Sequence, residues 1–153
     1  MASKQTAATK ESARREPWEI KVYLVISGFE GSPDKISRVL GIQPTRTKLR
    51  GEPVSFGELE TKLRRKANFW ILDSGRPTTA DLADQVTAVV RQVQGSVPGF
   101  TDLPQGTTVT LTCAIYDYSR SVPLVFDASA ISALAAIGAD LNIDYYDLTE
   151  YDE

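Results

Sequence analysis

Hydrophobic and polar residues alternate along residues 19–27 and again along residues 107–116, which is the pattern of strands that bury one face. Residues 69–73 are apolar on both faces, as in a central strand. Alternation returns at residues 140–146, and a further strand is predicted at 122–126, whose proline favours an edge position. The chain therefore predicts an antiparallel sheet built from these segments.

Three helices are predicted between the strands. The sequence Ser32-Pro33-Asp34 is typical of a helix start, and Gly41 suits a left-handed residue at the helix end. Thr78 is the predicted N-cap of the second helix, and Asp127 or Ser129 that of the third. The connection between residues 95 and 106 is predicted to be an irregular loop because it holds two prolines and three glycines.

From residue 69 onward these elements follow the ferredoxin-like order β-α-β-β-α-β, in which helices cover one face of an antiparallel sheet. The first strand and helix precede this unit as an addition. Residues 1–17 are almost free of large apolar side chains and predict a disordered arm. We therefore expect a single α+β domain at residues 18–147, followed by an acidic tail at 148–153.

Composition narrows the function classes. The chain of 153 residues carries a formal charge of −3, so no overall charge favours nucleic acid or an anionic membrane. It has no histidine, which removes the commonest general base and metal ligand, and its one cysteine excludes an internal disulfide. No apolar run reaches the roughly 20 residues of a membrane span, and no signal peptide is recognisable, so a cytoplasmic location is expected.

The polar loop after Pro44 carries Arg46, Lys48 and Arg50, which could bind an anion. The alternative is a structural turn, fixed by the backbone roles of the preceding glycine and proline. A second basic run at residues 62–66 lies beside Phe69 and Trp70 and could bind nucleic acid by stacking. The acidic composition favours a solvated segment there instead.

The last strand places Asp140, Asn142 and Asp144 on one face, which we interpret as a wet surface rather than a metal site. No metal or cofactor is predicted. Cys113 lies among apolar neighbours and is expected to be inert. Tyrosines gather late in the chain, where they either form a protein-recognition patch or merely edge the sheet. They are Tyr116, Tyr118, Tyr145, Tyr146 and Tyr151.

An ordered set of segments resembles a family of small bacterial proteins catalogued only as a domain of unknown function. The set comprises Leu40-Gly41-Ile42-Gln43-Pro44-Thr45, Gly51, the Trp-centred strand 70–74 and the segment 134–146. Asn142 stands where an acid is often found in that family. The resemblance implies a small intracellular protein and brings no activity, cofactor or site residue.

The leading hypothesis is a non-enzymatic binding or interaction module, of which an immunity-type protein is one form. Its expected binding residues are Arg46, Lys48, Arg50, Tyr116, Asp144 and Tyr146. One alternative is a small-ligand binder or histidine-free enzyme, using Asp144 and Asp147 with Arg46 or Arg50 in a cleft. Another is weak nucleic-acid binding through residues 62–66. The expected partner is another protein or a second copy, paired through residues 122–126 or through the last strand.

Overall fold

The fold is that of a computed structural model, which describes residues 16–56 and 59–149. The predicted arm at residues 1–15 and the end of the predicted tail at 150–153 therefore lie outside the described residues. Within the described ranges, no helix has both the length and the apolar character needed to cross a membrane.

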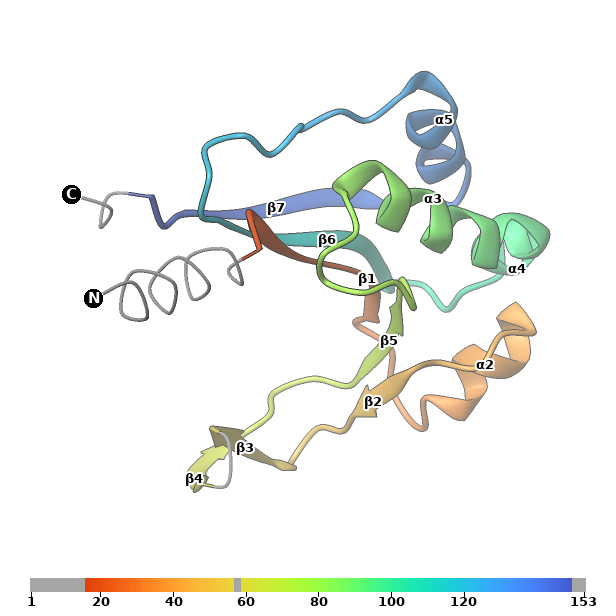
Figure 1. Ribbon diagram of the computed structural model, residues 1–153. Helices are drawn as coiled ribbons and strands as arrows, with labels where there is room; N and C mark the ends of the chain where they lie inside the picture. Colours follow the sequence, from red (N-terminus) through yellow and green to blue (C-terminus); the bar gives the residue numbers. More distant parts are fainter. Residues whose placement is uncertain (1–15, 57–58, 150–153) are drawn as a thin grey trace, which may run out of the picture.

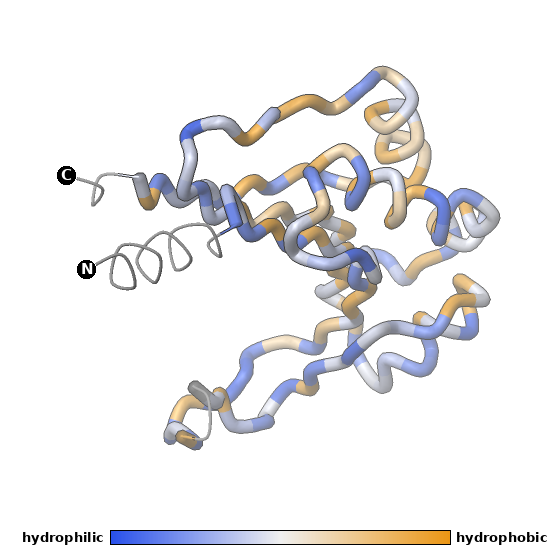
Figure 2. Tube along the Cα trace, viewed as in Figure 1, coloured by the Kyte–Doolittle hydropathy of each residue, from blue (hydrophilic) through white to orange (hydrophobic). Residues whose placement is uncertain are grey.

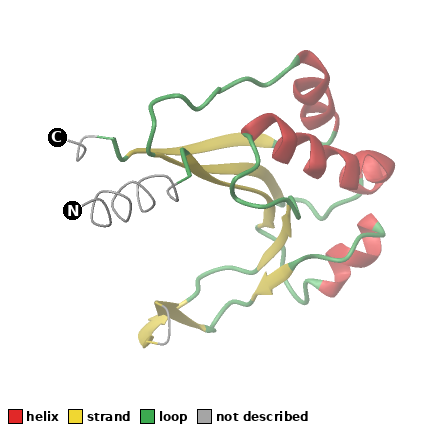
Figure 3. Cartoon of the chain, viewed as in Figure 1, coloured by secondary structure: helices red, strands yellow, loops and turns green. Residues whose placement is uncertain are grey.

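The chain forms a five-stranded sheet, a separate hairpin and several helices (Figure 1). In chain order the elements are β1 (Trp18–Ser27), α2 (Asp34–Leu40), β2 (Arg46–Lys48), β3 (Pro53–Phe56), β4 (Leu59–Arg64), β5 (Phe69–Asp73), α3 (Leu82–Val93), a 3-10 turn (Gln94–Ser96), α4 (Val97–Thr101), β6 (Thr108–Asp117), α5 (Ala128–Ala136) and β7 (Asp140–Asp147). The sheet order is β2-β5-β1-β6-β7, so β1 lies at the centre. The helices lie on one side of this sheet (Figure 3).

The core lies between the helices and the inward faces of β1, β5 and β6 (Figure 2). Register brings Leu24 of β1 opposite Leu72 of β5 on one side and opposite Leu111 of β6 on the other. All three side chains are buried, as alternation predicts for one face of a sheet. Trp70 is fully buried, and its indole Nε1 donates a hydrogen bond of 3.0 Å to Ser37 Oγ on α2.

Two features of the predicted topology are wrong. Residues 122–126 form no strand; they cross over the helix side of the sheet, with Val122 and Phe126 packed on the core. As a result β6, α5 and β7 form a β-α-β crossover unit, and β7 runs parallel to β6 rather than antiparallel. The order predicted from residue 69 is therefore absent, and β1 is the central strand rather than an addition in front.

Two of the predicted helix-end residues, Gly41 and Asp127, have the predicted role, whereas Thr78 does not. Gly41 closes α2 with φ of 70°, and Asp127 caps α5 by accepting the Ala130 N–H at 2.7 Å. The cap of α3 is Asp81 and not the predicted Thr78, because the Asp81 carboxylate accepts the Asp84 N–H at 2.8 Å. The supposed irregular loop at 95–106 contains the short helix α4.

The polar stretch after Pro44 provides β2 at one edge of the sheet and then the hairpin of β3 and β4. Antiparallel pairing of β2 with β5 places Arg46 opposite Ile71 and Lys48 opposite Phe69. The hairpin extends away from the helices (Figure 1, yellow-green). The helices of the described ranges cover one face of the five-stranded sheet, and the opposite face carries the polar residues of the alternating strands.

Candidate functional site

The face of the sheet opposite the helices displays the second set of alternating residues from all five strands. Arg46 and Lys48 come from β2, and Lys21 and Tyr23 come from β1. On β7 the same face carries Asp140, Asn142, Asp144 and Tyr146. The basic side chains therefore belong to one side of this face and the acidic side chains to the other.

The site is centred where β5 ends. Beyond that point the first half of β1 pairs with β6 on one side and has no strand beside it on the other. Pairing of β1 with β5 covers only residues 23–27 of β1. Residues 74–81 turn over the remaining half, where the Ile20 N–H donates to the Thr78 carbonyl and the Ser74 N–H donates to the Val22 carbonyl. This loop replaces a strand, and its residues form one wall of the site.

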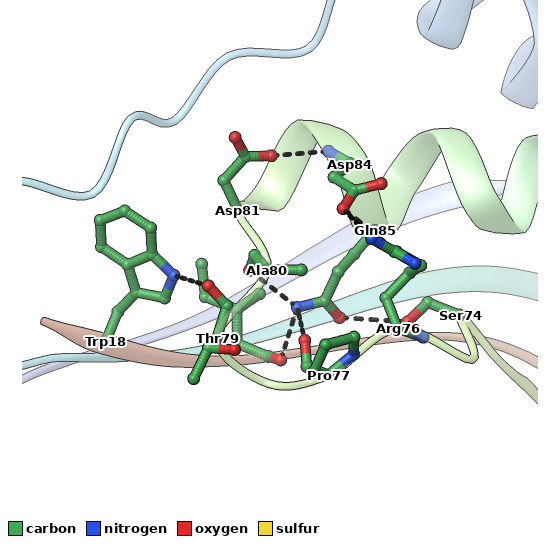
Figure 4. Close-up of polar contacts among 10 residues, drawn as sticks. Trp18, Ser74, Arg76, Pro77, Thr79, Ala80, Asp81, Asp84 and Gln85 are labelled. Atoms are coloured by element: carbon green, nitrogen blue, oxygen red, sulfur yellow. Dashed lines mark hydrogen bonds and ion pairs between the residues drawn. The ribbon is translucent and has the colours of Figure 1, made fainter. Parts of the chain in front are cut away.

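Gln85 of α3 holds that arrangement together (Figure 4). Its Nε2 donates to the carbonyls of Ile20 at 2.7 Å and Ala80 at 3.1 Å. Its Oε1 accepts the Val22 N–H and the Ser74 hydroxyl, both at 3.2 Å. The side chain is only 1% exposed, so these bonds satisfy backbone groups that no strand reaches.

A cavity of about 710 Å³ opens beside this loop. Among the described residues, four cationic side chains contribute to its lining, whereas Asp73 is the only carboxylate that does so. The cations are Lys21, Arg46, Lys48 and Arg76. Tyr23 adds an aromatic ring. A cavity with this excess of positive charge has the electrostatic character of a site for an anionic group.

The carboxylate does not neutralise the cations. Asp73 Oδ2 accepts a hydrogen bond of 2.6 Å from Arg46 Nη1, and the Arg46 guanidinium lies 5.4 Å from the centre of the Tyr23 ring. In the described part of the chain, neither Lys21 nor Lys48 has a carboxylate within ion-pair distance. Arg46 is thus oriented by two neighbours, while Lys48 has no counter-charge.

The environment of Lys48 disfavours its positive charge. Partial burial lowers the pKa of Lys48, and the nearby charges of Arg65 and Arg46 lower it further. The buried Nε atom of Arg65 has no hydrogen-bond partner among the described residues. Burial and then the charge of Asp144 raise the pKa of Tyr23, so its hydroxyl is protonated at neutral pH. An anion bound here would relieve repulsion among the cations and supply an acceptor for their N–H groups.

The structure brings together some of the predicted site residues and separates others. Arg46 and Lys48 share the cavity, whereas Arg50 lines a different hollow beside Asn68, whose Oδ1 accepts the Arg50 N–H at 2.8 Å. Tyr116 and Tyr146 stack with ring centres 5.0 Å apart on the uncovered face, on the side toward β7. They are two of the five tyrosines that the sequence grouped together; Tyr145 lies on the helix side of β7, and Tyr151 lies outside the described residues.

Asp144 and Asp147, predicted to act together in a cleft, project from opposite faces of β7. Asp144 shares the uncovered face with Ala114, whereas Asp147 shares the helix side with Asp117. The predicted acid pair therefore does not form. Of the two aromatic residues beside residues 62–66, Trp70 is completely buried and cannot stack on a base, whereas Phe69 is partly exposed.

Four residues of the cavity were missed by sequence reasoning: Lys21, Tyr23, Asp73 and Arg76. Alternation in the first strand already placed Lys21 and Tyr23 on one face, so a search of that face would have found them. Arg76 follows a turn, and nothing local indicates that the turn folds back on β1.

Two other chemistries have no support from the described residues. Cys113 is fully buried on the helix side of β6, and burial raises the pKa of its thiol to about 12, so it stays protonated. Within residues 16–56 and 59–149, no group of three Asp, Glu or Cys side chains is placed to hold a metal ion.

Fold and cavity together define an α+β domain that covers one face of a five-stranded sheet with helices and carries a cationic cavity on the other. The chain belongs to the family described as a domain of unknown function, DUF4279, whose model matches residues 18–148. No curated protein and no solved structure matches the chain.

Proposed function

We propose that this protein is a non-enzymatic binding module that holds an anionic group, a phosphate or carboxylate, in the cavity beside β1 and β5. The observation that carries the proposal is the lining: four cations against one carboxylate in a cavity of about 710 Å³. Lys48 supplies a second line of support, since its positive charge lies near two others without a counter-charge.

The arrangement of the cations supports recognition of an anionic group. Arg46 is held in place by Asp73, and Arg76 by an ion pair of 3.0 Å with Asp84, so both guanidinium groups are pre-oriented. Catalysis would need a group that exchanges a proton near neutral pH at the cavity. Tyr23 is not such a group, because burial raises the pKa of its hydroxyl. The immunity-type role remains a prediction, in which the anionic group would belong to a protein partner.

The test is a titration of the ¹⁵N-labelled full chain with inorganic phosphate, with acetate as the carboxylate probe and chloride as the ionic-strength control. Saturable shifts are expected at residues 21–23, 46–48 and 74–78. The variants Arg46→Gln and Lys48→Met should each weaken binding about tenfold, which corresponds to about 1.4 kcal/mol.

Lys35→Met is the matched control, because Lys35 is an exposed lysine of α2 on the helix side of the sheet. It removes the same charge without touching the cavity. Equal phosphate affinity in the Lys48 and Lys35 variants would show that binding reflects overall charge and would contradict the proposal. Shifts confined to the hairpin of β3 and β4 would contradict it as well.

We also infer that the elements from β1 to β6 form a ferredoxin-like unit, to which α5 and β7 are added. The sheet order β2-β5-β1-β6 supports this, with α2 and α3 as the two crossovers and the β3–β4 hairpin inserted between β2 and β5. The uncovered face of such a unit is free for ligand binding.

A further inference from the structure

The two edges of the five-stranded sheet are protected very differently. At one edge, β2 has three residues, two of which are cationic, and short charged strands resist pairing with other chains. At the other edge, β7 has eight residues and contains neither proline nor lysine. Strand β7 pairs only with β6 in the described part of the chain, so a long edge is left available.

Apolar side chains on β7 are exposed along the helix side of this edge. Leu141 is 46% exposed, Ile143 40% and Tyr145 44%. The crossover from β6 to β7 adds Leu124, Val125 and Ile131, all of them exposed. A long edge bordered by apolar side chains is the feature that folded proteins otherwise avoid, unless a partner strand covers it.

We propose that a second copy of this chain covers the edge, with β7 of each copy pairing antiparallel around a two-fold axis. The axis would run perpendicular to the sheet and place Ile143 opposite the partner's Ile143. The two sheets would then form one continuous sheet, with the helices of both copies on the same side.

The register follows from the side chains of β7. A two-fold axis perpendicular to the sheet keeps each face on its own side, so only residues of the same face can be opposite one another. Centring the axis on Ile143 sets Leu141 against the partner's Tyr145 in the apolar row. In the polar row, Asp144 meets the partner's Asn142 and Asp140 meets the partner's Tyr146, so each carboxylate faces a hydrogen-bond donor.

Neighbouring registers lack this complementarity. Centring on Asp144 opposes that carboxylate to its own copy, and centring on Asn142 opposes Asp144 to the partner's Asp140. Centring on Tyr145 sets Ile143 against the partner's Asp147 and shortens the overlap. The strand is therefore complementary to itself in one register, which is why we choose a second copy as its occupant over an unrelated strand.

Analytical ultracentrifugation of the full chain over a concentration series tests the proposal. The wild type is expected to show a monomer–dimer equilibrium. Asn142→Asp should raise the dissociation constant about tenfold or more, because symmetry creates two carboxylate pairs. The exchange Asn142→Asp with Asp144→Asn restores an Asp–Asn pair and should return the dissociation constant to near the wild-type value.

Gln94→Glu is the matched control, since Gln94 is exposed at the end of α3 and the change adds the same charge away from β7. It should dimerise as the wild type does. A wild type that stays monomeric at every soluble concentration would overturn the proposal. So would an Asn142→Asp variant that dimerises normally, or an exchange variant no better than the single one. Circular dichroism spectra of all variants should coincide, because the Asn142 side chain is exposed.

Discussion

Tyr145 and Asp117 are joined by a hydrogen bond of 2.6 Å, in which the phenol donates to the carboxylate Oδ2 across the parallel pair of β6 and β7. Asp117 is only 1% exposed and forms no ion pair with any cation in the described ranges. Its Oδ1 accepts the N–H groups of Ser119 and Arg120, both at 2.9 Å. One carboxylate thus fastens β7 to β6 and shapes the turn that follows β6.

Removing that carboxylate should destabilise the fold strongly. Asp117→Ala removes the acceptor of four partly buried hydrogen bonds from Ser119, Arg120 and Tyr145, and we expect the free energy of unfolding to fall by about 2 kcal/mol. Tyr145→Phe should lower it by less, because the other bonds to Asp117 remain. Urea denaturation at pH 7 measures both. Tyr116→Phe is the control, since its hydroxyl bonds to no described residue, and a loss as large as that of Tyr145→Phe would contradict the assignment.

The same pair predicts a pH dependence. Burial alone would raise the pKa of Asp117, but hydrogen bonds from Tyr145, Ser119 and Arg120 outweigh it and lower the pKa. The contribution of Asp117 to the stability of the fold is therefore complete above the pKa of about 3.9 of an unfolded aspartate. It is lost as the pH falls through the lower pKa that Asp117 has in the folded protein. The bond to Asp117 raises the pKa of Tyr145 to about 12, so its contribution is lost as the pH rises from about 10 to 12. The alkaline loss should be smaller in Tyr145→Phe.

Gln85→Met tests the side chain that replaces a strand beside β1. The variant keeps the volume but removes the partners of the Val22 N–H and the Ile20 carbonyl, so we expect a loss of about 3 kcal/mol in the free energy of unfolding. Gln94→Met, at the exposed C-cap of the same helix, should change the free energy of unfolding by less than about 0.5 kcal/mol. Hydrogen exchange should also speed up at Val22. Two equal losses would show that Gln85 acts only through helix stability.

Asp73→Asn separates stability from binding in the cavity. The side chains of Arg46 and Asp73 are 44% and 33% exposed, so their ion pair should contribute no more than about 1 kcal/mol. The variant removes the carboxylate that the described residues contribute to the lining. Loss of this negative charge should outweigh the lost orientation of Arg46, so phosphate should bind several-fold more tightly. Asp81→Asn would be a poor control, because Asp81 caps α3. Asp34→Asn on α2 is the better control. Isothermal titration calorimetry measures the phosphate affinity of the Asp73→Asn and Asp34→Asn variants. Weaker phosphate binding in Asp73→Asn than in the wild type would contradict the cationic site.

Gly99→Ala and Gly95→Ala form a matched pair for packing. A Cβ at Gly99 would lie 2.6 Å from the Val39 carbonyl oxygen, where α4 crosses α2, whereas one at Gly95 would meet nothing within 4 Å. We expect Gly99→Ala to lower the free energy of unfolding by about 2 kcal/mol and Gly95→Ala to leave it unchanged or raise it slightly. Thermal denaturation distinguishes the two, and equal melting temperatures would show that α4 can shift away from α2.

Local patterns predicted the parts of this fold that depend on near neighbours. Alternation located β1 and β6 because each buries one face, and the glycine after Leu40 marked a helix end because only a left-handed residue fits there. The prediction of a strand at 122–126 was wrong. Val122 and Phe126 pack on the core, and an extended crossover segment can place these two side chains there without pairing with another strand.

The site depends on pairings that are distant along the chain. Arg46 and Lys48 were found as cations in a loop, but their use follows from pairing between β2 and β5, which brings them beside Lys21. The loop that carries Arg76 is held down by Gln85, eleven residues beyond Ser74. Nothing in either local sequence specifies these contacts.

The position of Cys113 gives the molecule a built-in reporter of its own unfolding. The only thiol of the chain is fully buried on the middle strand pair of β1 and β6, where it lies opposite Val22. Its side chain lies in the core under the helices, so a small alkylating reagent can reach it only when that core opens, and the rate of labelling measures how often this happens. The same burial leaves no exposed thiol to cross-link copies of the chain, and covalent dimers in an oxidising solution would therefore mark molecules that had already opened.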